Sequence, residues 1–227
     1  MLSLAIAKQH DVPPPKYFNN PASNDIIGNP KHKPKHEGLP RIASSHSIPC
    51  YAVDSILLRS FMKFPPYAVV LRDIREVLVS HYAKHGSDYL RKKDADFATY
   101  LRSNPMKKRF RNDVWWYMHF QNRWGKLASK FPDQVRIFHY ADLRNDPEGG
   151  LRGIAEHFGL ELSDEAIAYA MENSTKEAME NYRDPSVKFR IVREDDDSNA
   201  PVYSDSDKAF LADTLKENLR FPLGYSY

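Results

Sequence analysis

The hydrophobic positions of the chain form short continuous runs that alternate with longer stretches at helical spacing. Tyr67–Leu71 and Val135–His139 are short apolar-rich runs, which are typical of strands. Between them, residues 113–130 carry apolar side chains at helical spacing, and Pro132 ends that pattern. A strand, a long helix and another strand in succession require a crossover. The pattern therefore predicts an α/β fold with a central parallel sheet flanked by helices.

Capping signals and apolar spacing predict further helices along the chain. They cover residues 2–7, 51–63, 74–85, 147–158, 174–181 and 206–219, and Ser163 is expected to cap a further helix that begins at 164. A short strand is expected at 42–44. Residues 11–38 are rich in proline and 184–204 are rich in charge, so both are predicted to be irregular loops. With 227 residues and 41% apolar content, the chain is predicted to form one domain over 1–227 with a substantial core.

The segment after the first strand carries candidate phosphate ligands. Arg72 ends the strand Tyr67–Leu71, Asp73 is placed to cap the following helix, and Ser80 lies about two turns further on. Arginine offers a planar fork to phosphate oxygens, and serine offers a single hydroxyl donor. A cation delivered to the mouth of a helix is a common phosphate site. The alternative is an ordinary strand–helix unit with a surface arginine.

The motif R-D-x-x-x-x-x-x-S formed by this segment resembles the 3′-phosphate-binding segment of sulfotransferases that use 3′-phosphoadenosine 5′-phosphosulfate (PAPS). Residues 135–165 resemble the same family's strand, its Y-E-D-L segment and its helix ending in F-L-G-L, with Tyr140, Asp142 and Leu143 in register and Ala141 in place of an acidic residue. Residues 39–49, LPRIASSHSIP, resemble the family's P-R-x-x-K-T-H-x-P, with serines where lysine and threonine are usual. The resemblance covers about 39–179.

This resemblance implies a P-loop-NTPase-like three-layer domain and sulfuryl transfer from PAPS to a hydroxyl or amine of a small-molecule or glycan acceptor, with no metal. Arg72 and Ser80 would bind the 3′-phosphate, and Tyr140 would line the nucleotide or acceptor pocket. His46 would be the general base. Arg190 or Arg193, in the late loop, would wrap the 3′-phosphate. These roles are expectations from the resemblance.

The start of the chain departs from the family pattern. Residues 2–7 read as the inside of a buried helix with no cap before it, and none of the nine glycines lies in a K-S-G-T-T-W-like phosphosulfate loop. The expectation is that Met1 lies inside the helix that follows that loop, so that the chain is truncated and lacks full activity. The alternative is that Met1 is the natural start.

Net charge and composition limit the classes of ligand and the cellular location that are expected. A net charge of +3 suits an anionic ligand but is too small to argue for nucleic acid. The single cysteine, Cys50, forms no intramolecular disulfide and fits a reducing compartment, so the expected location is cytoplasmic. No apolar run approaches the roughly 20 residues of a membrane span.

Several other functions remain open from the sequence. One is a non-catalytic nucleotide-binding or scaffold relic of the same fold. Another is a small-molecule kinase, which would need a P-loop and magnesium carboxylates. The basic stretch 91–111 would bind nucleic acid or an anionic acceptor, or is a solvated helix face. His81 and His85 stand four apart but lack the glutamate of a zinc protease, and His46 with Cys50 lacks an orienting partner for nucleophilic catalysis.

Overall fold

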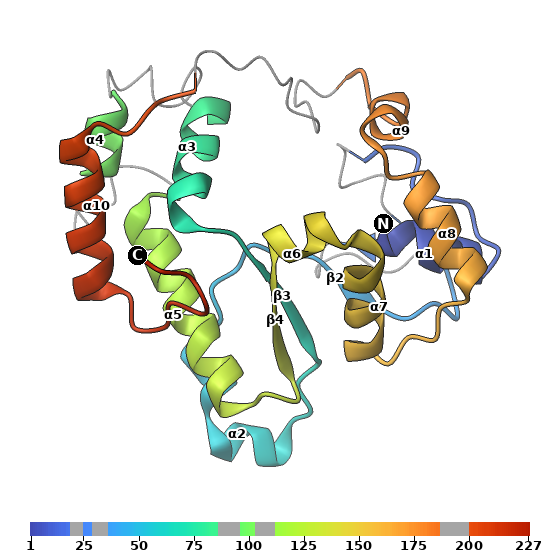
Figure 1. The fold of residues 1–227 in the computed structure, drawn as a ribbon. Helices are drawn as coiled ribbons and strands as arrows, with labels where there is room; N and C mark the ends of the chain where they lie inside the picture. The colour runs from blue at the N-terminus through green and yellow to red at the C-terminus, as the bar shows by residue number, and fades with distance from the viewer. Residues whose placement is uncertain (19–24, 29–35, 86–95, 103–111, 187–199) are drawn as a thin grey trace. The chain divides into compact units, whose positions relative to one another are not determined.

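The computed structural model describes residues 1–18, 25–28, 36–85, 96–102, 112–186 and 200–227 (Figure 1). The described helices are α1 (Leu2–Gln9), α2 (Ile56–Phe61), α3 (Ile74–His85), α4 (Phe97–Leu101), α5 (Val114–Lys130), α6 (Tyr140–Asn145), α7 (Pro147–His157), α8 (Asp164–Glu172), α9 (Lys176–Asn181) and α10 (Asp205–Asn218). The described strands are β1 (Ile27–Gly28), β2 (Ile42–Ala43), β3 (Tyr67–Leu71) and β4 (Val135–His139).

The strands form two separate parallel pairs in the described part of the chain. β1 pairs with β2, and β3 pairs with β4 over its full length, from Tyr67 opposite Val135 to Leu71 opposite His139. The predicted parallel crossover between the strands at 67–71 and 135–139 is therefore confirmed. A larger central sheet is not seen among the described residues, because the two pairs are not joined by hydrogen bonds.

The chain divides into two compact units, each built from two stretches of sequence. One comprises Met1–His46 with Ala141–Asp196, and the other comprises Ser47–Tyr140 with Asp197–Tyr227. The prediction of a single domain over 1–227 stays a prediction.

The unit that contains β3 and β4 has its helices anchored by caps and apolar faces. Asp113 caps α5 by accepting a hydrogen bond from the amide of Trp116 at 3.0 Å, and the helix predicted at 113–130 is confirmed. The apolar residues of α5 contribute to two core clusters. One cluster is formed with residues of α3, α4 and α10, and the other is formed with residues of β3 and β4. The first includes Val114 and Met118 and the second includes Trp124 and Leu127. The apolar residues at helical spacing along α5 therefore belong to the core.

The other unit is mainly helical in its described part. Leu4 and Ala5 of α1 lie in one core cluster with Leu151 of α7 and Ile167 of α8, which confirms the buried face expected near the start of the chain. Gly159, directly after the end of α7, has φ +67°, a left-handed conformation that favours glycine at this place.

The helix predicted over 51–63 is wrong in extent. The chain forms a 3-10 turn at Tyr51–Asp54 and then the short helix α2, which Ser55 caps. Ile56, Leu57 and Phe61 are exposed by 69–80%. Ser55 breaks the regular pattern because its side chain accepts the hydrogen bond that begins a new helix.

Candidate functional site

The candidate site lies at the carboxyl end of the β3–β4 pair. Leu71 and His139 are opposite one another in the register, so the residues that follow them, Arg72 and Tyr140, leave the two strands at the same edge. The guanidinium carbon of Arg72 lies 5.1 Å from the centre of the Tyr140 ring, a cation–π distance. The structure thus brings together two of the predicted site residues, 68 positions apart in sequence (140 minus 72).

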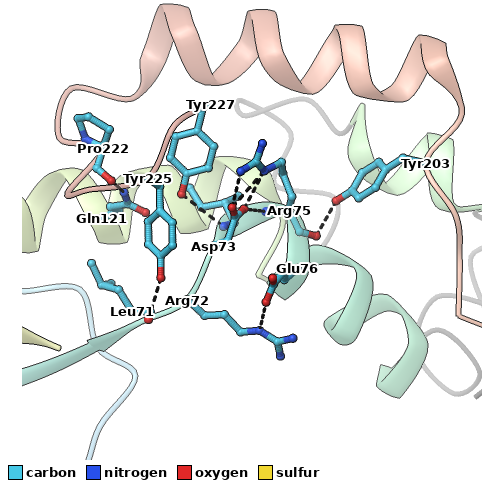
Figure 2. A network of polar contacts seen from close by, with 11 residues as sticks. Leu71, Arg72, Asp73, Arg75, Glu76, Gln121, Tyr203, Pro222, Tyr225 and Tyr227 are labelled. Carbon is cyan, nitrogen blue, oxygen red and sulfur yellow. Dashed lines mark hydrogen bonds and ion pairs between the residues drawn. The ribbon is translucent and has the colours of Figure 1, made fainter. Parts of the chain in front are cut away.

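The Arg72 side chain is held through one of its nitrogens. Its Nε donates to the Glu76 carboxylate at 2.8 Å, and the side chain is 35% exposed (Figure 2). Among the described residues, this is the hydrogen bond that Arg72 makes with its side chain. No described residue forms a hydrogen bond with its two terminal nitrogens, and such a pair of guanidinium nitrogens is the usual partner of phosphate oxygens in proteins.

The first turn of α3 is already satisfied by protein groups. The Asp73 carboxylate accepts from the amide of Arg75 at 2.8 Å, which confirms the predicted cap. The amide of Ile74 donates to the Tyr227 hydroxyl at 3.4 Å. These two backbone amides already have hydrogen-bond partners within the protein. The positive charge at this edge of the strand pair is therefore that of the Arg72 side chain and not that of free amides at the N-terminus of α3.

Arg75 does not share the role of Arg72. Its guanidinium pairs with the Asp73 carboxylate at 2.5 Å, and this hydrogen-bonded pairing raises the pKa of Arg75. It also lies 5.2 Å from the centre of the Tyr227 ring. The two terminal nitrogens of Arg72, in contrast, make no ion pair with a carboxylate of any described residue.

Ser80 is half-buried on α3 and lies four residues beyond Glu76. Residues four apart share one face of a helix, about 6 Å apart along its axis. Arg72 bonds to Glu76 in the first turn of α3, and Ser80 follows Glu76 by one turn along the helix. Joint binding of one phosphate by Arg72 and Ser80 stays a prediction from the sequence.

The predicted base is in a different setting. His46 is exposed and follows β2 in irregular chain, as part of the other compact unit. Within the described ranges no hydrogen bond to its ring is found. The chain just before it is tied to β1, since the amide of Ser44 donates to the Gly28 carbonyl at 3.1 Å. Arg190 and Arg193 lie outside the described residues, as does most of the basic stretch 91–111.

Three residues that support the site, Glu76, Tyr225 and Tyr227, were not predicted from the sequence. Glu76 was detectable, because an acid four residues after an arginine at the start of a helix is a familiar pairing. Tyr225 and Tyr227 gave no local signal, because they contact Leu71 and Ile74, 154 and 153 positions away.

The ion cluster around Asp54 is a structural feature, and it lies apart from the predicted site residues in sequence. Asp54 and Arg123 are both buried and paired at 3.2 Å, and Lys126 adds a contact of 2.9 Å. Hydrogen bonds from Arg123 and then Lys126 lower the pKa of Asp54 to about 2. Asp54 is therefore ionised at neutral pH, as a salt-bridged carboxylate is expected to be.

Two further features bear on the class of protein. No described helix has the length and apolar character needed to cross a membrane. In the described ranges, no group of three or more His, Cys, Asp or Glu side chains is placed to hold a metal ion.

Comparison with known proteins supplies the family. No curated protein matches the chain. The model of the sulfotransferase domain matches residues 27–198, which is more than half of the chain and includes Arg72, Ser80, Tyr140 and His46. The chain belongs to the sulfotransferase domain family.

Proposed function

We propose that this protein transfers a sulfuryl group from PAPS to a hydroxyl or amine of a small-molecule or glycan acceptor. Membership of the family supports sulfuryl transfer in general. The observation that supports PAPS as the donor is the position of the Arg72 side chain and its contacts with Glu76 and Tyr140. This side chain stands at the end of β3, fixed through Nε by Glu76 and stacked on Tyr140, and no described residue forms a hydrogen bond with its terminal nitrogens.

In this proposal Arg72 binds the 3′-phosphate with its two terminal nitrogens, and Ser80 donates its hydroxyl from α3. Tyr140 limits the movement of the guanidinium and lines the nucleotide pocket. Arg190 or Arg193 adds a second cation. These groups bind and orient the donor, and they leave the bond-breaking step to other parts of the protein.

His46 acts in the transfer itself. Its ring accepts the proton from the acceptor O–H or N–H, the acceptor atom forms a bond to sulfur, and the bond from sulfur to the bridging phosphate oxygen breaks with its electron pair left on that oxygen. Imidazole suits this task near neutral pH. The exposure of His46 allows an acceptor to reach it. We extend the proposal to a P-loop-NTPase-like sheet that contains the β3–β4 pair.

Two other functions share parts of this site. A non-catalytic nucleotide-binding protein would use Arg72 and Ser80 without His46. A small-molecule kinase would require a magnesium-bound nucleotide triphosphate. A binding measurement followed by a turnover measurement separates the three.

The experiment is calorimetry of the purified chain with adenosine 3′,5′-bisphosphate, adenosine 5′-phosphate and magnesium ATP. A charge-assisted contact contributes about 1.5–3 kcal/mol, so the bisphosphate should bind at least about tenfold tighter than the monophosphate. A preference for magnesium ATP would contradict the proposal. Transfer of labelled sulfate from PAPS to a panel of phenols, alcohols, amines and glycans then separates the enzyme from the non-catalytic protein.

A further inference from the structure

The C-terminal segment 220–227 is hydrogen-bonded to α5 (Figure 2). The side-chain amide of Gln121 donates to the carbonyls of Phe221 and Pro222, both at 3.0 Å. The side-chain oxygen Oδ1 of Asn122 accepts from the backbone amide of Arg220 at 2.7 Å. Because Gln121 is 2% exposed, its two bonds are shielded from water, and buried amide donors of this kind are costly to leave unpaired.

Gly125 permits the close approach of this segment to α5. A Cβ at position 125 would lie 2.5 Å from the Cβ of Phe221, closer than two carbon atoms can approach. Glycine inside a helix is unfavourable by about 0.5–1 kcal/mol relative to alanine. Its presence here is explained by the contact with Phe221.

After Pro222 the segment turns toward the strand ends. Leu223 and Gly224 both have positive φ, 51° and 90°. The turn brings the Tyr225 ring to 5.1 Å from the ring of His139, the last residue of β4. The segment therefore reaches the edge of the β3–β4 pair at which Arg72 and Tyr140 stand.

Two tyrosine hydroxyls then contact the backbone on either side of Arg72. Tyr225 donates to the carbonyl of Leu71 at 3.2 Å, and the Tyr227 hydroxyl accepts from the amide of Ile74 at 3.4 Å. Burial raises the pKa of Tyr227 to about 12, so its hydroxyl stays protonated at neutral pH. The backbone is thus held one residue before Arg72 and two residues after it.

We infer that Tyr225 and Tyr227 are positioning residues of the 3′-phosphate site, which hold the Leu71–Ile74 backbone so that the Arg72 guanidinium is placed for the phosphate before the nucleotide arrives. This inference rests on the proposed function. Fixing a residue's backbone costs roughly 1–2 kcal/mol, and a site that is already ordered does not lose that free energy on binding. The two tyrosines do not touch the nucleotide in this account.

The test compares Tyr225→Phe, Tyr227→Phe and the double variant with Tyr100→Phe. The control also removes a hydroxyl that donates to a backbone carbonyl, that of Asn112 at 2.7 Å, and it keeps the ring. Each protein is measured by amide hydrogen exchange without ligand and by calorimetry with adenosine 3′,5′-bisphosphate and adenosine 5′-phosphate. Thermal melting confirms that each variant is folded.

We expect faster exchange of the amides at 72–75 in the tyrosine variants and unchanged exchange there in the control. The double variant should lose roughly three- to tenfold of its affinity for the bisphosphate, the size of a lost hydrogen bond, with little change for the monophosphate. Unchanged exchange at 72–75 would overturn the inference whatever the protein binds. Faster exchange with an unchanged preference for the bisphosphate would also overturn it.

The proposed function fails in a different way. If the unaltered chain does not prefer the bisphosphate, the 3′-phosphate assignment is overturned and the positioning role falls with it, even where exchange at 72–75 responds to the tyrosines. A response in both measurements supports the inference and the site together.

Discussion

Two segments with predicted roles, the Arg72 segment and the His46 segment, are built in different ways. Arg72 stands between a paired strand and a capped helix, with Glu76 on its Nε and Tyr140 against its plane. His46 is exposed in irregular chain, and no described residue forms a hydrogen bond with its ring. A side chain that binds phosphate works best when its charge is held in place before the phosphate arrives. A general base, in contrast, can take its final orientation from the acceptor that it deprotonates.

The chain just after His46 is nevertheless firmly anchored. The Trp124 indole donates to the carbonyl of Ser47 at 3.3 Å, and Arg123 donates to the carbonyls of Pro49 and Cys50 at 3.3 and 3.1 Å. Arg123 also pairs with buried Asp54. The contrast between the two segments therefore concerns the imidazole of His46 and not the backbone that follows it.

The largest expected effect is on turnover, and it tests the division of roles between the two segments. His46→Ala should lower sulfate transfer by roughly 10²–10⁴-fold, the usual range for a positioned general base. The affinity for adenosine 3′,5′-bisphosphate should stay the same, because His46 faces the acceptor in this account. The assay requires a form of the protein that transfers labelled sulfate. Full turnover by the variant on every acceptor used by the unaltered protein would assign the proton to another residue.

The next largest effect is on stability and concerns the anchor after His46. Asp54→Ala leaves the Arg123 guanidinium buried without its carboxylate and should lower the free energy of unfolding by about 3 kcal/mol. Lys126→Ala is the matched control, because its side chain is 52% exposed and such a pair contributes about 0–1 kcal/mol. Urea unfolding of both variants measures the difference. Equal losses would show that the buried pair is not the anchor.

A smaller effect sharpens the Arg72 segment. Ser80→Ala should weaken adenosine 3′,5′-bisphosphate by roughly tenfold, the size of one hydrogen bond to a charged group. Adenosine 5′-phosphate should bind as before. Ser60→Ala on α2, where the hydroxyl donates to the carbonyl of Leu57, serves as the control. A loss of the same size for both nucleotides would remove Ser80 from the 3′-phosphate.

The smallest effect is the response of the anchor to acid. The pKa of Asp54 is lowered to about 2 in the folded protein, so the unfolded chain takes up a proton first as the pH falls through about 4. The stability that Asp54 contributes is present above about pH 4 and is lost as the pH falls toward 2. One group changes stability by at most about 1.4 kcal/mol per pH unit. Urea midpoints from pH 5 to pH 3 should fall less steeply for Asp54→Asn, and parallel slopes would contradict the assignment.

The elements that the sequence predicted are those with strong local signals. β3, β4, α3 and α5 follow from apolar runs, from helical spacing and, for α3, from the cap Asp73. β1 was not predicted, because Ile27–Gly28 is two residues of strand inside a proline-rich stretch. The exposure of Phe61 on α2 was also not predictable, because apolar spacing does not say what covers a helix face.

The site was predictable in part for the same reason. Arg72 and Ser80 belong to a local motif, and the pairing of β3 with β4 brought Tyr140 to Arg72 as the crossover requires. The contacts of Tyr225 and Tyr227 depend on a turn with positive φ at Leu223 and on a segment hydrogen-bonded to α5. Such contacts are set by tertiary packing, so periodicity and capping rules do not contain them.

The central claim is that Arg72 recognises the 3′-phosphate. The most direct test is the ratio of affinities for adenosine 3′,5′-bisphosphate and adenosine 5′-phosphate, measured by calorimetry for Arg72→Ala and for Arg136→Ala, an exposed arginine on β4. The account predicts that Arg72→Ala loses roughly 10- to 100-fold of this ratio, as expected for a charge-assisted contact, and that Arg136→Ala keeps it. An equal loss of affinity for both nucleotides in Arg72→Ala, with the ratio unchanged, would contradict the claim.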